Sequence, residues 1–209
     1  MKIYIILLFF SLLGSVSTGV IAKTDENCLN CVSRGKEWCS SMKSCDVLWC
    51  PSEHSVFKEY PDYELWINGH SLGGALASVA ASHLVDQKIF RAEIIKLVTM
   101  GQPRTGDYDY ALWHDQTFPY SFRIVHNRDI VPHIPPQLGP GYSLFHHRTE
   151  IWYPNDMEMG APFQKCESAD GYYCSATLDF NLSYEDHGFY FVKEMPAWGG
   201  AGCPTLWLK

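Results

Sequence analysis

The feature that most restricts the fold of this chain is the segment 69–73, whose sequence is Gly-His-Ser-Leu-Gly. It follows an apolar, β-favouring run at 64–67 and precedes a run of small, helix-forming residues at 75–85. A G-x-S-x-G segment between a strand and a helix places its serine on a sharp turn, with the hydroxyl clear of the sheet. Such a turn leaves no room for bulk beside the serine, which explains the glycines. An accidental turn is the alternative, but the flanking strand and helix favour a nucleophilic Ser71.

The helix after Ser71 adds an electrostatic argument. Its first backbone N–H groups and the positive end of its dipole would face negative charge that develops beside the serine. The Leu72 N–H is therefore the predicted oxyanion donor. We expect this helix to face a core on most sides, because small and apolar residues fill nearly all of its positions.

Two further apolar runs, 94–100 and 122–125, each end in a turn-forming segment. Strands that alternate with helical or loop crossovers are typical of an α/β fold, a mostly parallel sheet with flanking helices. In such folds the functional loops gather at the carboxyl ends of the strands. A short helix is also predicted at 54–60.

A serine alone is a poor nucleophile, so a base and an orienting acid are needed downstream. Asp129 follows the apolar run 122–125, where a strand-end loop would present it to the same edge as Ser71. His187 lies in a predicted loop ahead of an aromatic run and is the last histidine of the chain. The order Ser, Asp, His is that of the α/β-hydrolases. The alternatives are a turn-capping aspartate and a surface histidine.

The remaining histidines compete for the role of base, and spacing alone does not exclude them. Most of them are disfavoured as the base by their position inside the elbow, on the helix or around Asp129. The competing residues are His70, His83, His114, His126, His133, His146 and His147. The neighbours His146 and His147 would point to opposite faces of a strand, so a shared metal ion is not expected. The acyl-serine chemistry needs neither a metal nor a cofactor.

Several segments in the same order resemble the class 3 (fungal-type) lipases of the α/β-hydrolase superfamily, and within them a secreted animal, nematode-like member. The likeness covers residues 59 to 191 and rests on the segments 69–77, 101–106, 127–132 with Pro135-Pro136, 142–153 and 186–191. It implies a Ser71, Asp129, His187 triad that hydrolyses ester bonds of triacylglycerols or related lipids. It also implies a lipid ester as partner, met at a lipid–water interface.

The chain departs from that family ahead of the elbow. The family carries a long segment there, with core strands, the second oxyanion donor and a helical lid, and this chain has room for only a short helix. The fold is therefore expected to be incomplete at the front, with an unpaired apolar edge at 65–67. Since the loss of one oxyanion donor costs roughly 10²- to 10³-fold in rate, the alternative is a catalytically weak or inactive lipase-like binding protein.

The beginning of the chain indicates export. A basic start, an apolar run at 3–13 and small residues near 20–22 are typical of a signal peptide at 1–22. A membrane anchor is the rival, but the glycine, serine and threonine residues at 14–18 make a weak spanning helix, so no integral span is expected after signal removal. A cysteine-rich disulfide module is predicted at 23–51 and the lipase-like domain at 52–209.

Eight cysteines favour an oxidising compartment and disulfide bonds: Cys28, Cys31, Cys39, Cys45, Cys50, Cys166, Cys174 and Cys203. Spacing does not fix their pairing, although at least one bridge must join the early and late groups if all pair. Zinc binding at the C-x-x-C of Cys28 is the alternative, and no second matching pair supports it. The sequon at Asn181 is a predicted glycosylation site in a secreted, extracellular chain.

Charge narrows the class of partner. The 209 residues carry a formal net charge of -7, and their Lys and Arg residues form no basic block. Nucleic acid and anionic membrane are therefore disfavoured as partners. A secreted noncatalytic scaffold predicts indifference to Ser71→Ala, whereas an acyltransferase or phospholipase would share the serine chemistry and differ only in substrate.

Overall fold

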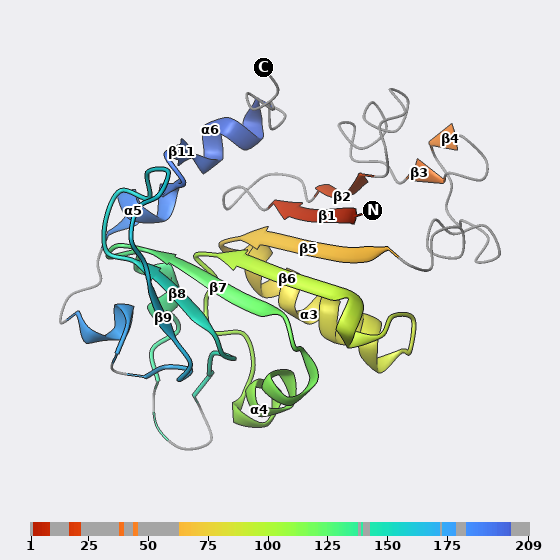
Figure 1. The fold of residues 1–209 in the computed structure, drawn as a ribbon, viewed down its shortest axis with the longest axis horizontal. Coiled ribbons are helices and arrows are strands. Elements are labelled where there is room, and N and C mark those ends of the chain that lie inside the picture. Colours follow the sequence, from red (N-terminus) through yellow and green to blue (C-terminus); the bar gives the residue numbers. More distant parts are fainter. Residues whose placement is uncertain are drawn as a thin grey trace.

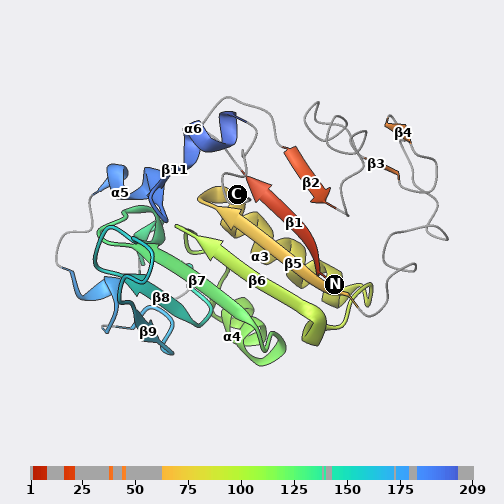
Figure 2. The ribbon, with the colours of Figure 1, turned by 45° about the horizontal axis from the view of Figure 1, so that its top comes forward.

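The apolar runs of the sequence become neighbouring strands of one twisted sheet (Figure 1). In the computed structural model the described residues are 2–8, 17–21, 38–39, 44–45, 63–137, 139, 143–171, 173–178 and 183–201. Within them, the main sheet has the order β2-β1-β5-β6-β7-β8-β9 (Figure 2). Strands β1, β5, β6, β7 and β8 are parallel, and the edge strands β2 and β9 are antiparallel. The predicted α/β-hydrolase type of sheet, mostly parallel with flanking helices, is confirmed.

The strands of the sheet have the following bounds: β1 (Lys2–Leu8), β2 (Ser17–Ile21), β5 (Glu64–His70), β6 (Ile95–Met100), β7 (Ser121–His126), β8 (Glu150–Tyr153) and β9 (Gln164–Cys166). Two small antiparallel pairs lie outside it: β3 (Trp38–Cys39) with β4 (Ser44–Cys45), and β10 (Phe189–Tyr190) with β11 (Lys193–Glu194).

The longest described helix, α3 (Leu72–Asp86), packs against β5 and β6 through small residues. Ala77 and Ala81 are fully buried in a cluster with Ile67 and Leu97, so the helix lies close to the sheet. As predicted, this helix faces a core on most sides: seven of its fifteen residues are buried, and Ala80, Leu84 and Val85 pack against the same cluster. The exposed residues form a single stripe: Leu72, Leu76, Val79, His83 and Asp86.

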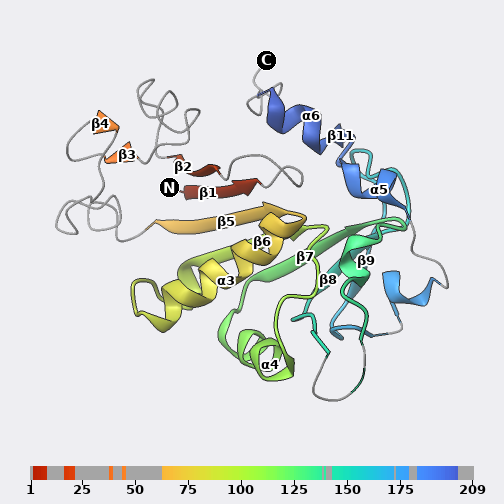
Figure 3. The ribbon, with the colours of Figure 1, turned by 180° about the vertical axis from the view of Figure 1, so that it is seen from behind.

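The other helices are shorter: α4 (Tyr108–Thr117), α5 (Tyr184–Gly188) and α6 (Met195–Gly200), with 3₁₀ turns at Ala92–Ile94, Val131–His133 and Ser175–Thr177. Helices α3 and α4 cover the same face of the sheet, as the view from behind shows (Figure 3). In the described part of the chain, the helices are too short or too polar to cross a bilayer. The predicted helix at 54–60 lies outside the described residues.

In this structure, which includes residues of the predicted signal peptide, the edge beside 65–67 is paired; the prediction of an unpaired edge concerned the chain without residues 1–22. Strand β1 pairs with β5 in parallel register, with Ile3 opposite Leu65 and Ile5 opposite Ile67. An apolar run of this length suits a signal peptide or a buried parallel strand equally well, and hydrophobicity alone does not distinguish the two. The signal peptide at 1–22 stays a prediction, and its removal would also remove β1 and β2.

Among the residues whose side chains the structure describes, a disulfide bond joins Cys166 on β9 to Cys174. It packs under β7 and β8 with Val125 and Trp152. Cys39 and Cys45 belong to the small β3–β4 pair. Four other cysteines and the sequon asparagine lie outside the described residues: Cys28, Cys31, Cys50, Cys203 and Asn181.

Candidate active site

The turn between β5 and α3 holds Ser71 in a strained conformation. Its backbone has φ 59 and ψ -132, a region that non-glycine residues rarely adopt. Although Ser71 occupies the N-cap position of α3, its hydroxyl makes no capping hydrogen bond. A Cβ atom on Gly69 would lie 2.1 Å from the carbonyl oxygen of Gly73. Only glycine therefore fits there, as the sequence pattern predicts.

His187 reaches Ser71 from a distant part of the chain. Its Nε2 lies 2.8 Å from Ser71 Oγ, and its Nδ1 lies 2.9 Å from Asp129 Oδ2. The prediction that His187 lies in a loop is wrong, since the residue belongs to the short helix α5. Ser183 begins that helix, because its hydroxyl accepts a hydrogen bond from the Asp186 N–H at 2.9 Å.

Asp129 is fully buried just beyond the end of β7. Its Oδ1 accepts from the Val131 N–H at 2.8 Å, and its Oδ2 accepts from the Tyr190 hydroxyl at 2.6 Å as well as facing His187. Burial, and then the negative charge of Asp129, raises the pKa of Tyr190 well above its ordinary value. Tyr190 therefore stays protonated and donates to the carboxylate.

Two residues that contact this site were given no role of their own by sequence reasoning. Tyr190 follows His187 by three residues and appears in the sequence only as part of an aromatic run. Gly101 directly follows β6 and has φ 58, and a Cβ atom there would lie 2.7 Å from Asp129 Oδ2 and 2.9 Å from His187 Nδ1. The signal that could have found Gly101 is its place directly after a strand neighbouring β5.

The competing histidines make other contacts. His70 and His126 donate to the main-chain carbonyls of His187 and Asp186, at 2.8 and 2.9 Å. His146 contacts the carbonyl of Pro132, while His114 and His147 stack with their ring centroids 3.8 Å apart. The expectation that His146 and His147 are strand neighbours is wrong, since β8 begins at Glu150. Within the described residues no group of three potential metal ligands occurs.

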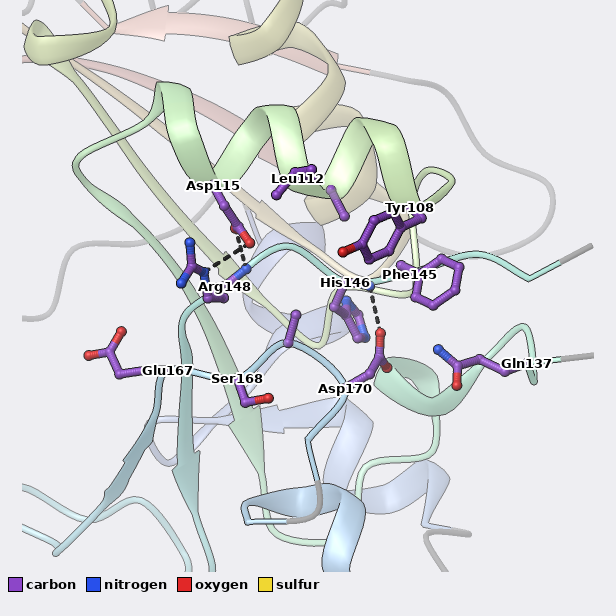
Figure 4. A pocket seen from close by; sticks show the side chains of 12 residues that line it. Tyr108, Leu112, Asp115, Gln137, Phe145, His146, Arg148, Glu167, Ser168 and Asp170 are labelled. Atoms are coloured by element: carbon purple, nitrogen blue, oxygen red, sulfur yellow. Dashed lines mark hydrogen bonds and ion pairs between the residues drawn. The ribbon is translucent and has the colours of Figure 1, made fainter. Parts of the chain in front are cut away.

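A separate hollow of about 730 Å³ lies between α4 and the loops that flank β8 and β9 (Figure 4). Its charged groups pair with protein partners: Arg148 Nε lies 3.0 Å from Asp115 Oδ2, and Asp170 Oδ2 accepts from the His146 N–H at 2.8 Å. None of the three predicted triad residues lines it. The candidate site is therefore the junction of β5, β7 and α5.

The fold and this junction define a class of protein. A mostly parallel sheet, a serine on a tight strand-to-helix turn, and an aspartate and a histidine supplied later in the chain are the marks of an α/β-hydrolase. Solved structures with this fold match the chain. The Rhizomucor miehei triacylglyceride lipase aligns with a TM-score of 0.60 and 34% identity, over 67% of this chain and 52% of that one.

The chain belongs to the class 3 lipase family. The family model described as Lipase (class 3) matches residues 18–139, more than half of the chain. A lipase of Caenorhabditis elegans is 37% identical over 179 residues, covering 72% of this chain and 51% of the relative. A secreted mono- and diacylglycerol lipase of Malassezia globosa is 31% identical over 152 residues, covering 70% and 45%. The chain thus spans about half the length of these two relatives.

Proposed function

We propose that this chain is a serine esterase that hydrolyses carboxylic ester bonds of triacylglycerols or related lipids. One observation carries the proposal: a continuous chain of contacts runs from Ser71 Oγ through both ring nitrogens of His187 to the buried Asp129 carboxylate, at 2.8 and 2.9 Å. A nucleophile within reach of a base, itself oriented by a carboxylate, is the arrangement that activates serine. The names of its relatives give the substrate class.

The proposed reaction follows from these positions. His187 Nε2 takes the proton of Ser71 as Oγ attacks the acyl carbonyl, and the resulting imidazolium is stabilised by Asp129. His187 then donates that proton to the departing alcohol, which leaves an acyl-serine. Water then attacks the acyl carbon and gives a proton to His187; the bond between the acyl carbon and Ser71 Oγ breaks as His187 returns that proton to Oγ, and the fatty acid departs. No cofactor or metal takes part in these steps.

Charge on the tetrahedral intermediate needs donors beside Ser71. We assign one to the Leu72 backbone N–H, because Leu72 is the first residue of α3 and the dipole of that helix is positive at this end. The Leu72 side chain is about half exposed, at 53%. It stands next to the serine as apolar surface suited to an acyl chain.

The proposed setting is extracellular, at a lipid–water interface. Its support is the signal-like segment at 1–22, the cysteine content and a relative that is itself described as secreted. A glycan on Asn181 belongs to the same proposal. The intact mass of the secreted chain, measured before and after enzymatic removal of N-glycans, tests both signal cleavage and glycosylation. The deglycosylated mass should equal that of a chain without residues 1–22, and the mass before treatment should be higher by that of the glycan.

The decisive experiment is labelling of the purified chain by a fluorophosphonate probe, which reacts only with an activated serine. Ser71→Ala should abolish labelling and leave the circular dichroism spectrum unchanged. Ser82→Ala is the matched control, since Ser82 lies on the same helix and its hydroxyl bonds the Ser78 carbonyl at 3.0 Å, away from His187. Labelling that persists in Ser71→Ala would disprove the assignment of the nucleophile.

The second candidate is a lipase-shaped binding protein with weak or no activity. The observation that favours it is coverage, because the chain corresponds to only about half the length of the C. elegans and Malassezia globosa relatives. An intact triad without a complete oxyanion site loses roughly 10²- to 10³-fold in rate. A folded chain that never labels, yet binds lipid vesicles equally well with and without Ser71→Ala, would establish this second candidate.

A further inference from the structure

The residue before the nucleophile, His70, makes two contacts with the base rather than with the serine. It is the last residue of β5 and is only 4% exposed. Its Nε2 lies 2.8 Å from the main-chain carbonyl oxygen of His187, and the two imidazole rings stack with centroids 4.6 Å apart and planes 26° apart. Because a carbonyl oxygen only accepts hydrogen bonds, the Nε2 of His70 carries the proton.

These contacts matter because α5 has little packing of its own. The helix is one turn long and none of its five residues is buried. Its main-chain carbonyls at 186 and 187 receive donors from two histidines, His126 Nδ1 at 2.9 Å and His70 Nε2 at 2.8 Å. Carbonyls at the end of a helix lack their usual partners within it, and the one at 186 also accepts from the Phe189 N–H. The two histidine side chains therefore add contacts that fasten α5 to the sheet.

The charge state of His70 suits this place. Burial, and then the nearby His187, lowers the pKa of His70 to about 4. The ring is therefore neutral at neutral pH and does not repel the imidazolium that His187 would form during acyl transfer. The edge of Tyr190 contacts the same ring, with centroids 5.5 Å apart.

We propose that His70 is a positioning residue for His187: its N–H fixes the main chain of α5 and its ring supports the face of the imidazole, which keeps His187 Nε2 at hydrogen-bond distance from Ser71. The printed contacts of the His70 ring are with His187 and Tyr190 and not with the serine oxygen, so His70 acts through the base. The inference rests on the proposed function only in the role of His187 as base.

Two substitutions separate the N–H donor from the ring. His70→Phe keeps a flat ring but has no donor, and His70→Gln keeps a donor near the Nε2 position but has no ring. We expect the maximal labelling rate with a fluorophosphonate to fall about tenfold in His70→Phe, the cost of one hydrogen bond. The probe concentration at half-maximal rate should not change, and His70→Gln should stay within about threefold of the unchanged chain.

The control is His114→Phe, which replaces a buried, stacked histidine away from Ser71. It should leave the labelling rate unchanged. If the labelling rate falls equally in His114→Phe and His70→Phe, the loss reflects general packing and the proposal is overturned. A full labelling rate in His70→Phe would also overturn it. If His70→Phe does not fold, His70→Gln decides: labelling within the stated range supports positioning, and its loss in a folded chain refutes it.

A spectroscopic readout keeps this test separate from the proposed function. The proton between His187 Nδ1 and Asp129 should give a downfield proton resonance whether or not the chain hydrolyses esters. It should be sharp in the unchanged chain and in His70→Gln, and broadened by exchange in His70→Phe. A resonance equally sharp in all three refutes positioning by His70, while a chain that shows these differences but never labels refutes only the esterase proposal.

Discussion

Tyr190→Phe removes one oxygen from the site and tests how the buried aspartate is stabilised. The Tyr190 hydroxyl donates to Asp129 Oδ2 at 2.6 Å, and both residues are almost completely buried. A hydrogen bond to a charged group contributes about 1.5–3 kcal/mol. Phenylalanine fills the same space, so we expect the free energy of unfolding to fall by that amount. For a domain of this size the melting temperature should drop by about 3–12 °C.

Tyr110→Phe is the matched control. The Tyr110 hydroxyl lies 2.7 Å from Ser78 Oγ and 3.1 Å from Ser82 Oγ, so it bonds only neutral partners between α3 and α4. Its loss should cost about 1 kcal/mol. Urea unfolding followed by circular dichroism gives both values. If Tyr190→Phe is destabilised no more than Tyr110→Phe, the carboxylate does not depend on the tyrosine and the reasoning from charge is wrong.

Three further predictions use other parts of the structure. Gly101→Ala should abolish fluorophosphonate labelling, because its Cβ would collide with Asp129 and His187. The control Gly160→Ala, at φ 84 with open space around it, should lower the free energy of unfolding by about 1 kcal/mol and label normally. Equal labelling of the two variants would show that the collision does not occur. Burial, and then the charge of Arg123, lower the pKa of His147 to about 3. Below pH 6.5 the unfolded chain therefore binds a proton at this residue that the native state does not bind. The stability that neutral His147 contributes above pH 6.5 should be lost as the pH falls towards 3. Urea titrations at several pH values should show that the free energy of unfolding falls less steeply with pH in His147→Phe than in the unchanged chain. If the two plots of unfolding free energy against pH are parallel, His147 is not a source of the pH dependence. Replacing both Cys166 and Cys174 by serine should cost about 2–3 kcal/mol, from the short loop that their bridge closes; an unchanged urea midpoint would show that the bridge adds no stability.

The sequence predicts the parts of this fold that depend on local pattern. The run at 64–67, the elbow at 69–73 and the small-residue helix are contiguous, and steric limits on the turn decide their conformation. Strands β6 and β7 are likewise recognisable because β-branched runs end in turn-forming residues. The order of these strands follows from short crossovers between neighbours in a parallel sheet.

Long-range contacts could not be predicted in the same way. The pairing of β1 with β5 joins residues about sixty positions apart, and the sequence of an apolar run does not indicate which strand it pairs with. The side of α3 that stays exposed depends on which of its residues meet the rest of the fold. The placement of Tyr190 against Asp129 depends on the β10–β11 turn, whose residues show no hairpin signature.

The sparse packing of α5 has a consequence for the way this protein would lose activity. Cooperative units of a folded chain open at different free energies, and a one-turn helix without buried side chains belongs to the low end of that range. The sheet that carries Ser71 and Asp129 has a buried core of its own. On gentle heating, His187 should therefore detach while the sheet remains intact, and labelling should decline several degrees before the ellipticity of the sheet and helices changes.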